Sequence, residues 1–147
     1  MISATAQYAL RAVVYLAGGE NGLVSRDEIA ESTIVPREYL SKVLVELEAA
    51  GIVESRRGRG GGYRLSRPAE EITTLEVVLC VDEIPRITEC PLGFSDHVKL
   101  CPMHKLLDDT SRLVEETLSA TTIADLCPDS QRSRSCGFPK KRPGGQV

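Results

Sequence analysis

Four residues that commonly bind metals lie close together in the second half of the chain. They fall within the fifteen residues from 90 to 104 and include both histidines of the protein: Cys90, His97, Cys101 and His104. Thiolates and imidazoles are ligands for zinc, iron and iron–sulfur clusters. Two cysteines and two histidines would complete a tetrahedral zinc site; the alternative is that loop cysteines and surface histidines are neighbours by coincidence. The spacing predicts a metal or iron–sulfur centre.

A second stretch with the chemistry of a binding surface is SRRGRGGGYRLSR, residues 55–67. It contains five arginines and no acidic residue, although the whole chain has a net charge of −3. Glycines permit a tight turn with positive φ angles, so residues 52–55 and 63–66 are predicted to form the two strands of a hairpin. We expect its arginines to contact phosphates or a narrow minor groove. The alternative is a solvated basic hairpin without a partner.

The residues before this hairpin predict three short helices. The first covers residues 3–17, the second opens with a capping box at Ser25–Glu28 and ends near Ser32, and the third starts from Pro36. Three helices followed by a hairpin form a winged helix-turn-helix, so the predicted fold class is mainly α with a small β-hairpin. In this fold the third helix enters the major groove of double-stranded DNA.

The third predicted helix has an apolar face and a polar face. Its apolar residues recur at helical spacing and are expected to point inward: Leu40, Val43, Leu44 and Leu47. Polar residues on the opposite face can donate to base edges or phosphates. The predicted DNA contacts therefore combine three residues of this helix with three of the hairpin: Arg37, Ser41, Lys42, Arg56, Arg57 and Arg59.

The second half of the chain is predicted to contain a dimerisation helix. Residues 72–82 form a mostly apolar segment that predicts a helix with a buried, inert Cys80. Residues 102–120 predict a longer helix with an apolar stripe from Met103 to Leu118. Such a stripe needs a partner, so we expect a homodimer that binds a palindromic operator. Alternatively, the stripe closes the core of its own chain.

These elements suggest three regions: a winged helix-turn-helix domain at 1–70, an effector loop and dimerisation helix at 71–127, and a disordered basic tail at 128–147. No apolar run approaches the roughly 18 residues that span a bilayer, and the first residues lack the basic region of a signal peptide. We therefore expect a cytoplasmic protein without a membrane partner. Its five cysteines would be reactive, metal-bound or buried. No nucleophile–base pair, phosphate-binding loop or pair of carboxylates indicates an enzyme.

Several stretches together resemble the Rrf-two family of bacterial winged-helix regulators over residues 1–127. They are QYALRAVVYLA, AAGIVES followed by RGRGGGYRLSR, TECPLG, CPMH and TTIADL. The resemblance implies a dimeric DNA-binding regulator, usually a repressor. Many members hold an iron–sulfur cluster, which would sense redox state, nitric oxide or iron–sulfur status. It also implies that Ser41, Lys42 and Arg57 contact DNA, and that Arg59 adds a charge where the family often has proline.

The resemblance also implies a set of ligands. Cys90 and Cys101 match the first and third cysteines of the family's cluster loop, and His104 matches the histidine of IscR-like members. The middle cysteine is absent, so His97 or Asp96 is the candidate for a fourth ligand. Mixed cysteine and histidine ligation favours a [2Fe–2S] cluster over [4Fe–4S]. The alternative is a regulator of the same family without a cluster, which uses cysteine thiols, zinc or a small effector.

Overall fold

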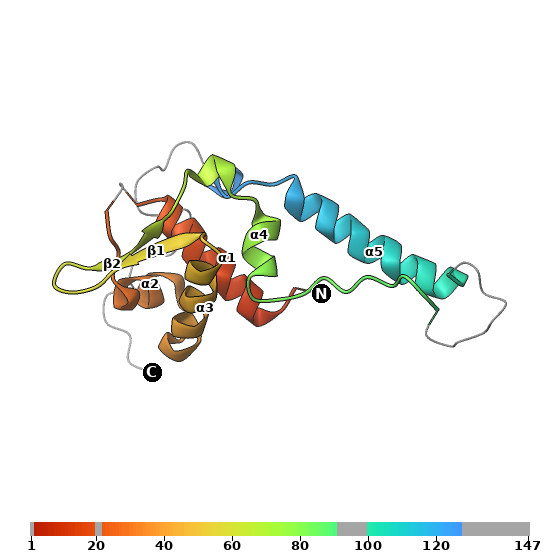
Figure 1. Cartoon of the computed structure of the whole chain (residues 1–147), viewed down its shortest axis with the longest axis horizontal. Helices are drawn as coiled ribbons and strands as arrows, with labels where there is room; N and C mark the ends of the chain where they lie inside the picture. Colours follow the sequence, from red (N-terminus) through yellow and green to blue (C-terminus); the bar gives the residue numbers. More distant parts are fainter. Residues whose placement is uncertain (1, 20–21, 91–99, 128–147) are drawn as a thin grey trace.

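The computed structural model describes residues 2–19, 22–90 and 100–127 (Figure 1). Its helices are α1 (Ala4–Ala17), α2 (Arg26–Thr33), α3 (Arg37–Ala49), α4 (Thr74–Leu79) and α5 (Pro102–Ser119), with short 3-10 helices η1 (Ala69–Glu71) and η2 (Ala124–Leu126). Strands β1 (Val53–Arg56) and β2 (Gly62–Leu65) pair in an antiparallel hairpin, with Val53 opposite Leu65. The predicted fold class is confirmed. None of the helices in the described ranges is long and apolar enough to cross a membrane.

Side-chain caps set the starts of several helices. The Ser3 hydroxyl accepts a hydrogen bond from the Ala6 amide at the start of α1, and the Ser25 hydroxyl accepts from the Glu28 amide at the start of α2. The capping box predicted at Ser25 is half formed, because the Glu28 carboxylate accepts from the Tyr15 hydroxyl on α1. A complete capping box is present at residues 73–76, where α4 begins.

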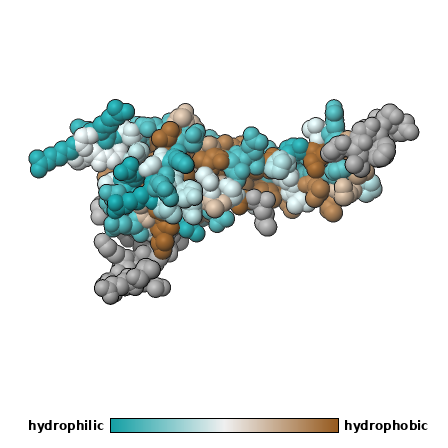
Figure 2. All heavy atoms as spheres, turned by 90° about the horizontal axis from the view of Figure 1, so that it is seen from below, coloured by the Kyte–Doolittle hydropathy of each residue, from teal (hydrophilic) through white to brown (hydrophobic). Residues whose placement is uncertain are grey.

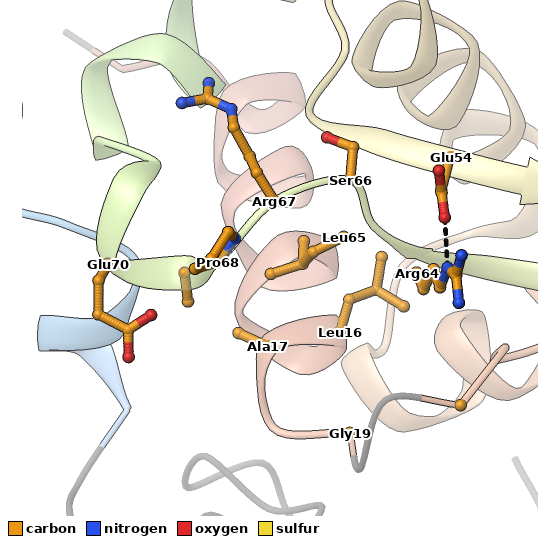
Figure 3. A pocket seen from close by; sticks show the side chains of 12 residues that line it. Leu16, Ala17, Gly19, Glu54, Arg64, Leu65, Ser66, Arg67, Pro68 and Glu70 are labelled. Carbon is orange, nitrogen blue, oxygen red and sulfur yellow. Dashed lines mark hydrogen bonds and ion pairs between the residues drawn. The ribbon is translucent and has the colours of Figure 1, made fainter.

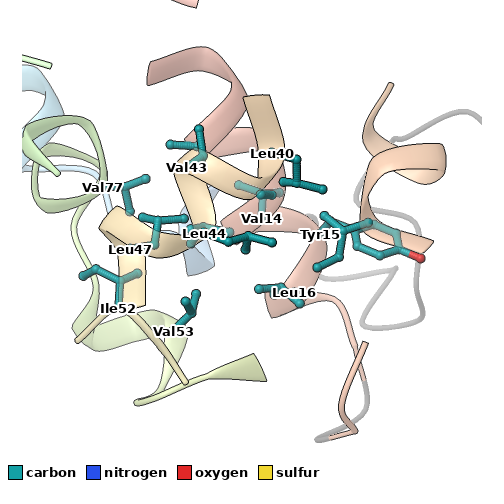
Figure 4. Close-up of a cluster of buried hydrophobic side chains, with 14 of the residues drawn as sticks. Val14, Tyr15, Leu16, Leu40, Val43, Leu44, Leu47, Ile52, Val53 and Val77 are labelled. Atoms are coloured by element: carbon teal, nitrogen blue, oxygen red, sulfur yellow. The ribbon is translucent and has the colours of Figure 1, made fainter. Parts of the chain in front are cut away.

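The hydrophobic core lies where α1, α2 and α3 meet (Figure 4). The four apolar residues predicted to face inward from α3 are all at most 1% exposed: Leu40, Val43, Leu44 and Leu47. Ile72, Val77 and Ile123 are buried in the same cluster. Segments that follow the hairpin therefore help to close the core that the first three helices build.

The boundaries of some elements differ from the predictions. Helix α3 begins at Arg37, so Pro36 is the residue before the helix and not its first residue. Both strands of the hairpin are displaced by one residue from the predicted ranges. Helix α4 covers only the middle of the predicted segment 72–82, because the backbone of Ile72 is extended and Thr73 caps the helix.

Cys80 is half-buried and follows the last residue of α4, whereas the sequence predicted a buried residue inside the helix. Its thiol donates to the Glu76 carbonyl at 3.1 Å. Burial raises the pKa of the Cys80 thiol, and the charges of Glu76 and Glu46 raise this pKa further. The protonated form is therefore favoured, which agrees with an unreactive cysteine.

Helix α5 extends from this core as a long arm (Figure 1). It packs on α4, and its one buried residue is His104. Four large apolar side chains of α5 are exposed: Met103 at 58%, Leu106 at 66%, Leu107 at 49% and Leu113 at 63%. Figure 2 shows hydrophobic side chains recurring along this arm. Within one chain, these four side chains of the stripe do not close a core.

Candidate metal centre and nucleic-acid interface

Helix α3 carries the predicted reading surface on the side opposite the core. Arg37, Lys42 and Val45 are exposed there, and Ser41 is half-buried. The helix is held by α1 and α2, against which it packs. This arrangement places the predicted contact residues of α3 on one outward face, as a recognition helix requires.

The hydroxyl of Ser41 is held by two other residues. It donates to the Arg37 carbonyl at 2.9 Å and accepts from Nη1 of Arg26 at 3.3 Å. While its proton is donated within the helix, Ser41 presents an acceptor to a base edge, for which the amino groups of adenine and cytosine are the partners. Arg26 was not among the predicted contacts. Its position directly after the Ser25 cap, on the helix that precedes α3, could have indicated it.

Arg37 is engaged by the neighbouring helix. Its guanidinium lies 3.5 Å from the Asp27 carboxylate and 3.8 Å from that of Glu31, both on α2. These ion pairs are exposed, and exposed pairs contribute only about 0–1 kcal/mol, so DNA could displace them. In this conformation, however, the charge of Arg37 is compensated.

The hairpin, or wing, is anchored on the core by the segment before α2. Val24 and Tyr63 exchange two backbone hydrogen bonds of 2.9 and 2.8 Å. Glycine is required at the tip, since a Cβ at Gly61 would lie 2.1 Å from the Arg56 carbonyl oxygen, and Gly60 has a φ of 74°. The wing projects from the protein as a hydrophilic extension (Figure 2).

The five arginines of residues 55–67 fall into two groups. Arg64 pairs with Glu54 across the hairpin, and Arg67 binds the Glu76 carboxylate at 2.5 Å. The other three are exposed and form no ion pair with the residues that the structure describes: Arg56, Arg57 and Arg59. The uncompensated charge of the wing therefore resides on the same three arginines that the sequence selected.

An open hollow of about 520 Å³ lies between the end of α1, strand β2 and η1 (Figure 3). Leu16 and Leu65 form part of its wall, and Arg64, Arg67 and Glu70 lie along it. Both arginines already bind carboxylates, so the hollow presents no uncompensated arginine to an anion.

The cysteine and histidine side chains meet at the start of α5. Cys101 precedes the first residue of the helix, Pro102 is its first residue, and His104 lies in its first turn. The Sγ atoms of Cys101 and Cys90 are 3.1 and 3.5 Å from Nδ1 of His104. One ligand atom from each residue lies within 4.8 Å of the other two. The predicted triad is thus brought together, whereas His97 and Asp96 lie outside the described residues.

The two sulfur–nitrogen distances of the triad fit a single tetrahedral metal ion. Zinc bonds of about 2.3 Å to sulfur and 2.0 Å to nitrogen separate these atoms by roughly 3.5 Å. The two sulfur–nitrogen distances of 3.5 and 3.1 Å are close to this value. A [2Fe–2S] centre divides its ligands between two irons, so its ligands must be spread more widely. The donor types suit either group.

A protein-family model described as Rrf2, iron-dependent transcriptional regulator, matches residues 2–129. The chain belongs to the Rrf2 family. The HTH-type transcriptional regulator IscR of Cereibacter sphaeroides is 33% identical over 138 residues, which cover 89% of this chain and 89% of that protein. The chain is therefore similar in sequence to a regulator over most of its length.

Solved structures support the same assignment. The structure of T. potens IscR matches this Rrf2 protein with a TM-score of 0.72 and 25% identity over 88% of both chains. The structure of CymR, the global cysteine regulator of B. subtilis, matches with a TM-score of 0.72 and 27% identity, over 86% of this chain and 95% of CymR. The Rrf2 protein is a transcriptional regulator and not an enzyme, and its family implies DNA binding.

Proposed function

We propose that this Rrf2 protein is a cytoplasmic, homodimeric repressor whose affinity for DNA is set by a metal or iron–sulfur centre. The observation that carries the proposal is the convergence of Cys90, Cys101 and His104 at the start of the arm. These donors come from two separate segments of a regulator fold. They suit soft metals and iron–sulfur clusters.

In this proposal the DNA is read by α3 and the wing. Ser41 and Lys42 enter the major groove, with Arg26 beside Ser41. Arg56, Arg57 and Arg59 contact phosphates or the minor groove, since their charge is exposed and uncompensated. Arg37 contributes after it leaves Asp27 and Glu31.

The exposed apolar face of α5 supports a homodimer. Large contiguous apolar patches are uncommon on monomeric proteins, and each fully buried leucine or methionine side chain contributes about 1.5–3 kcal/mol. A symmetric dimer formed through α5 would cover Leu106 and Leu113 of both protomers. It would also place two reading heads on a palindromic operator.

The position of the triad suggests how sensing is coupled to DNA binding. Cys90 ends a segment that follows α4, and Cys101 and His104 belong to the start of α5. Holding these three side chains together fixes the start of the dimer helix relative to α4, which packs on α1 of the reading head. When bound, an iron–sulfur cluster would supply reactivity toward oxidants and nitric oxide. Release of the triad would change the spacing of the two heads.

Two groups compete for the triad. The family resemblance and the mixed ligands favour [2Fe–2S] with a fourth ligand from His97 or Asp96. The compact spacing supports a single zinc ion as the second candidate, in which case the cysteine thiols would be the sensor.

The proposal is tested by anaerobic purification, a visible absorption spectrum, and assays of iron, sulfide and zinc on one sample. A cluster regulator is expected to be brown with near-equal iron and sulfide, and Cys90→Ala or Cys101→Ala should bleach it. Cys80→Ala is the matched control, because Cys80 lies outside the triad. Colourless protein with stoichiometric zinc would establish the second candidate. Protein without either metal would refute a metal sensor.

A further inference from the structure

The segment that delivers Cys90 to the triad has no regular secondary structure. After α4, residues 83–88 are neither helix nor strand. The segment runs alongside α5 toward the start of that helix (Figure 1). Cys90 must therefore be positioned by side-chain contacts.

Arg86 makes three such contacts with α5. Its Nε and Nη2 donate to the two carboxylate oxygens of Asp108 at 2.7 and 3.0 Å, and its Nη1 donates to Glu115 at 3.0 Å. The amide of Ile87 adds a fourth hydrogen bond, of 3.0 Å, to Asp108. Both acids lie on α5, so this tie joins the segment to the helix. Two-pronged arginine–carboxylate pairs combine strength with fixed geometry.

Asp108 is charged at neutral pH, so its pairing with Arg86 is available there. The hydrogen bonds from Arg86, followed by that from the Ile87 amide, lower the pKa of Asp108 to about 2. Asp108 is also shielded, with 17% of its side chain exposed. The carboxylate is therefore charged at any pH at which the protein would act.

The tie lies close to the metal ligands along both chain segments. Asp108 follows His104 by four residues, so the two occupy the same face of α5 one turn apart. Arg86 precedes Cys90 by four residues, and four residues of chain span at most about 14 Å. Anchoring Arg86 on Asp108 thus confines Cys90 to the neighbourhood of His104.

We propose that Arg86 is a positioning residue that preorganises the metal site by fixing the Cys90 segment against α5. The inference rests on the proposed metal-binding function of the triad and names the residue that makes its third donor available. Preorganisation raises affinity because the cost of ordering the ligand is met during folding. Substitution of residues that orient ligands commonly weakens metal binding by about 10–100-fold.

The first test measures Co²⁺ affinity of the full chain under anaerobic conditions, from the thiolate-to-cobalt absorption in competition with a chelator. We expect Arg86→Gln and Asp108→Asn to weaken Co²⁺ binding at least about tenfold. Arg86→Lys keeps the charge but loses the two-pronged pairing with Asp108. Its Co²⁺ affinity should therefore lie between that of these two variants and that of the unsubstituted protein. Arg112→Gln is the matched control, since the ion pairs that Arg112 makes with described residues are to Asp109 and Glu116 of its own helix, and it makes none to the Cys90 segment.

A second readout needs no metal. Oxidised glutathione takes two electrons and two protons from Cys90 and Cys101, which yields one intramolecular disulfide and two molecules of reduced glutathione. The equilibrium constant, measured by peptide mapping, reports how often the two thiols meet. We expect Arg86→Gln to lower it about tenfold or more, in parallel with the cobalt affinity. The thermal midpoint should stay near that of Arg112→Gln, which a general loss of structure would not allow.

The two readouts separate failure of this inference from failure of the proposed function. If the unsubstituted protein binds no Co²⁺, the metal function is refuted and the disulfide equilibrium alone decides the role of Arg86. If Arg86→Gln stays within twofold of the unsubstituted protein in the disulfide equilibrium, the inference is overturned. If Arg86→Gln does not fold, the same two measurements are made on Arg86→Lys and on the double variant Arg86→Asp with Asp108→Arg. The double variant restores a pair of opposite charges, so it should recover at least part of the Co²⁺ affinity and of the disulfide equilibrium constant.

Discussion

Substitution of the wing arginines tests the DNA interface most directly. Arg57 and Arg59 are exposed and form no ion pair within the described part of the chain, so their charge is available to phosphates. We expect the double variant Arg57→Ala with Arg59→Ala to bind DNA more weakly and with a lower salt dependence. If each of the two arginines contacts one phosphate in both protomers, the double variant removes four phosphate contacts from a dimer on DNA.

The size of the effect follows from counterion release. Each phosphate contact contributes about 0.9 to the slope of log affinity against log salt concentration, so four contacts lower the slope by about 3.6. Between 50 and 200 mM salt, the unsubstituted protein should lose about 150-fold more affinity than the variant. A monomer on DNA would show half of the change in slope.

The assay is fluorescence anisotropy with a labelled duplex of arbitrary sequence, because phosphate contacts do not depend on base sequence. The double variant Arg67→Ala with Arg112→Ala removes the same net charge from residues that already bind carboxylates, and it should leave the slope nearly unchanged. An unchanged slope for the wing variant would remove the wing from the contact surface. An equal fall in both variants would show that net charge alone is responsible.

Four further predictions concern the reading helix, the arm and the fold. Arg26→Gln should weaken DNA binding by about 0.5–1.5 kcal/mol, the usual contribution of one hydrogen bond, because Arg26 holds Ser41. The effect should exceed that of Arg37→Gln, since Arg37 is engaged by Asp27 and Glu31; an equal effect in a binding titration would contradict this order. Leu113→Glu should shift the protein to a monomer in light scattering without a loss of helix content, since Leu113 is 63% exposed within one chain; a dimer that persists would exclude this part of α5 from the interface. Ile34→Gly should raise the free energy of unfolding by up to about 1 kcal/mol. Ile34 has a φ of 56°, and this conformation costs a β-branched residue more free energy than the loss of chain entropy costs a glycine. A lower free energy of unfolding in a urea titration would show that the exposed Ile34 side chain makes a stabilising contact. The hydrogen bonds from Thr73, then that from Arg67, lower the pKa of Glu76. The carboxylate therefore stabilises the fold above the ordinary carboxylate pKa of about 4.3, and this contribution is lost as the pH falls through the lowered pKa. Glu76→Gln should make the thermal midpoint fall less steeply in acid, and an unchanged pH profile would show that Glu76 does not contribute in this way.

Much of the fold is encoded in local patterns. The helical recurrence of Leu40, Val43, Leu44 and Leu47 predicted a buried face that the structure confirms. The glycines of residues 58–62 predicted the hairpin because only glycine tolerates the backbone of the tip. Boundaries were less accurate: α4 is shorter than its apolar segment, since the extended Ile72 packs in the core before the helix begins.

The ligand types at residues 90, 101 and 104 were also evident from the sequence, because cysteine and histidine carry that chemistry in any context. The sequence did not show which arginine charges remain free of ion pairs and available to DNA. The five arginines of residues 55–67 are alike in the sequence, and only the structure separates the two that bind Glu54 and Glu76 from the three that do not. Pairing across a hairpin or between distant segments depends on register and packing, which local periodicity does not contain.

The sequence by itself therefore determined the winged helix-turn-helix pattern, the apolar stripe of the arm and the donors of the candidate metal centre. Tertiary structure decided that Arg26 holds Ser41, that Arg37 is engaged by α2, and that Arg86 ties the Cys90 segment to α5. The physical reason is the range of the interactions. Helical spacing and turn chemistry act over a few residues, whereas these hydrogen bonds and ion pairs join residues six to twenty-nine positions apart and exist only once the helices have packed.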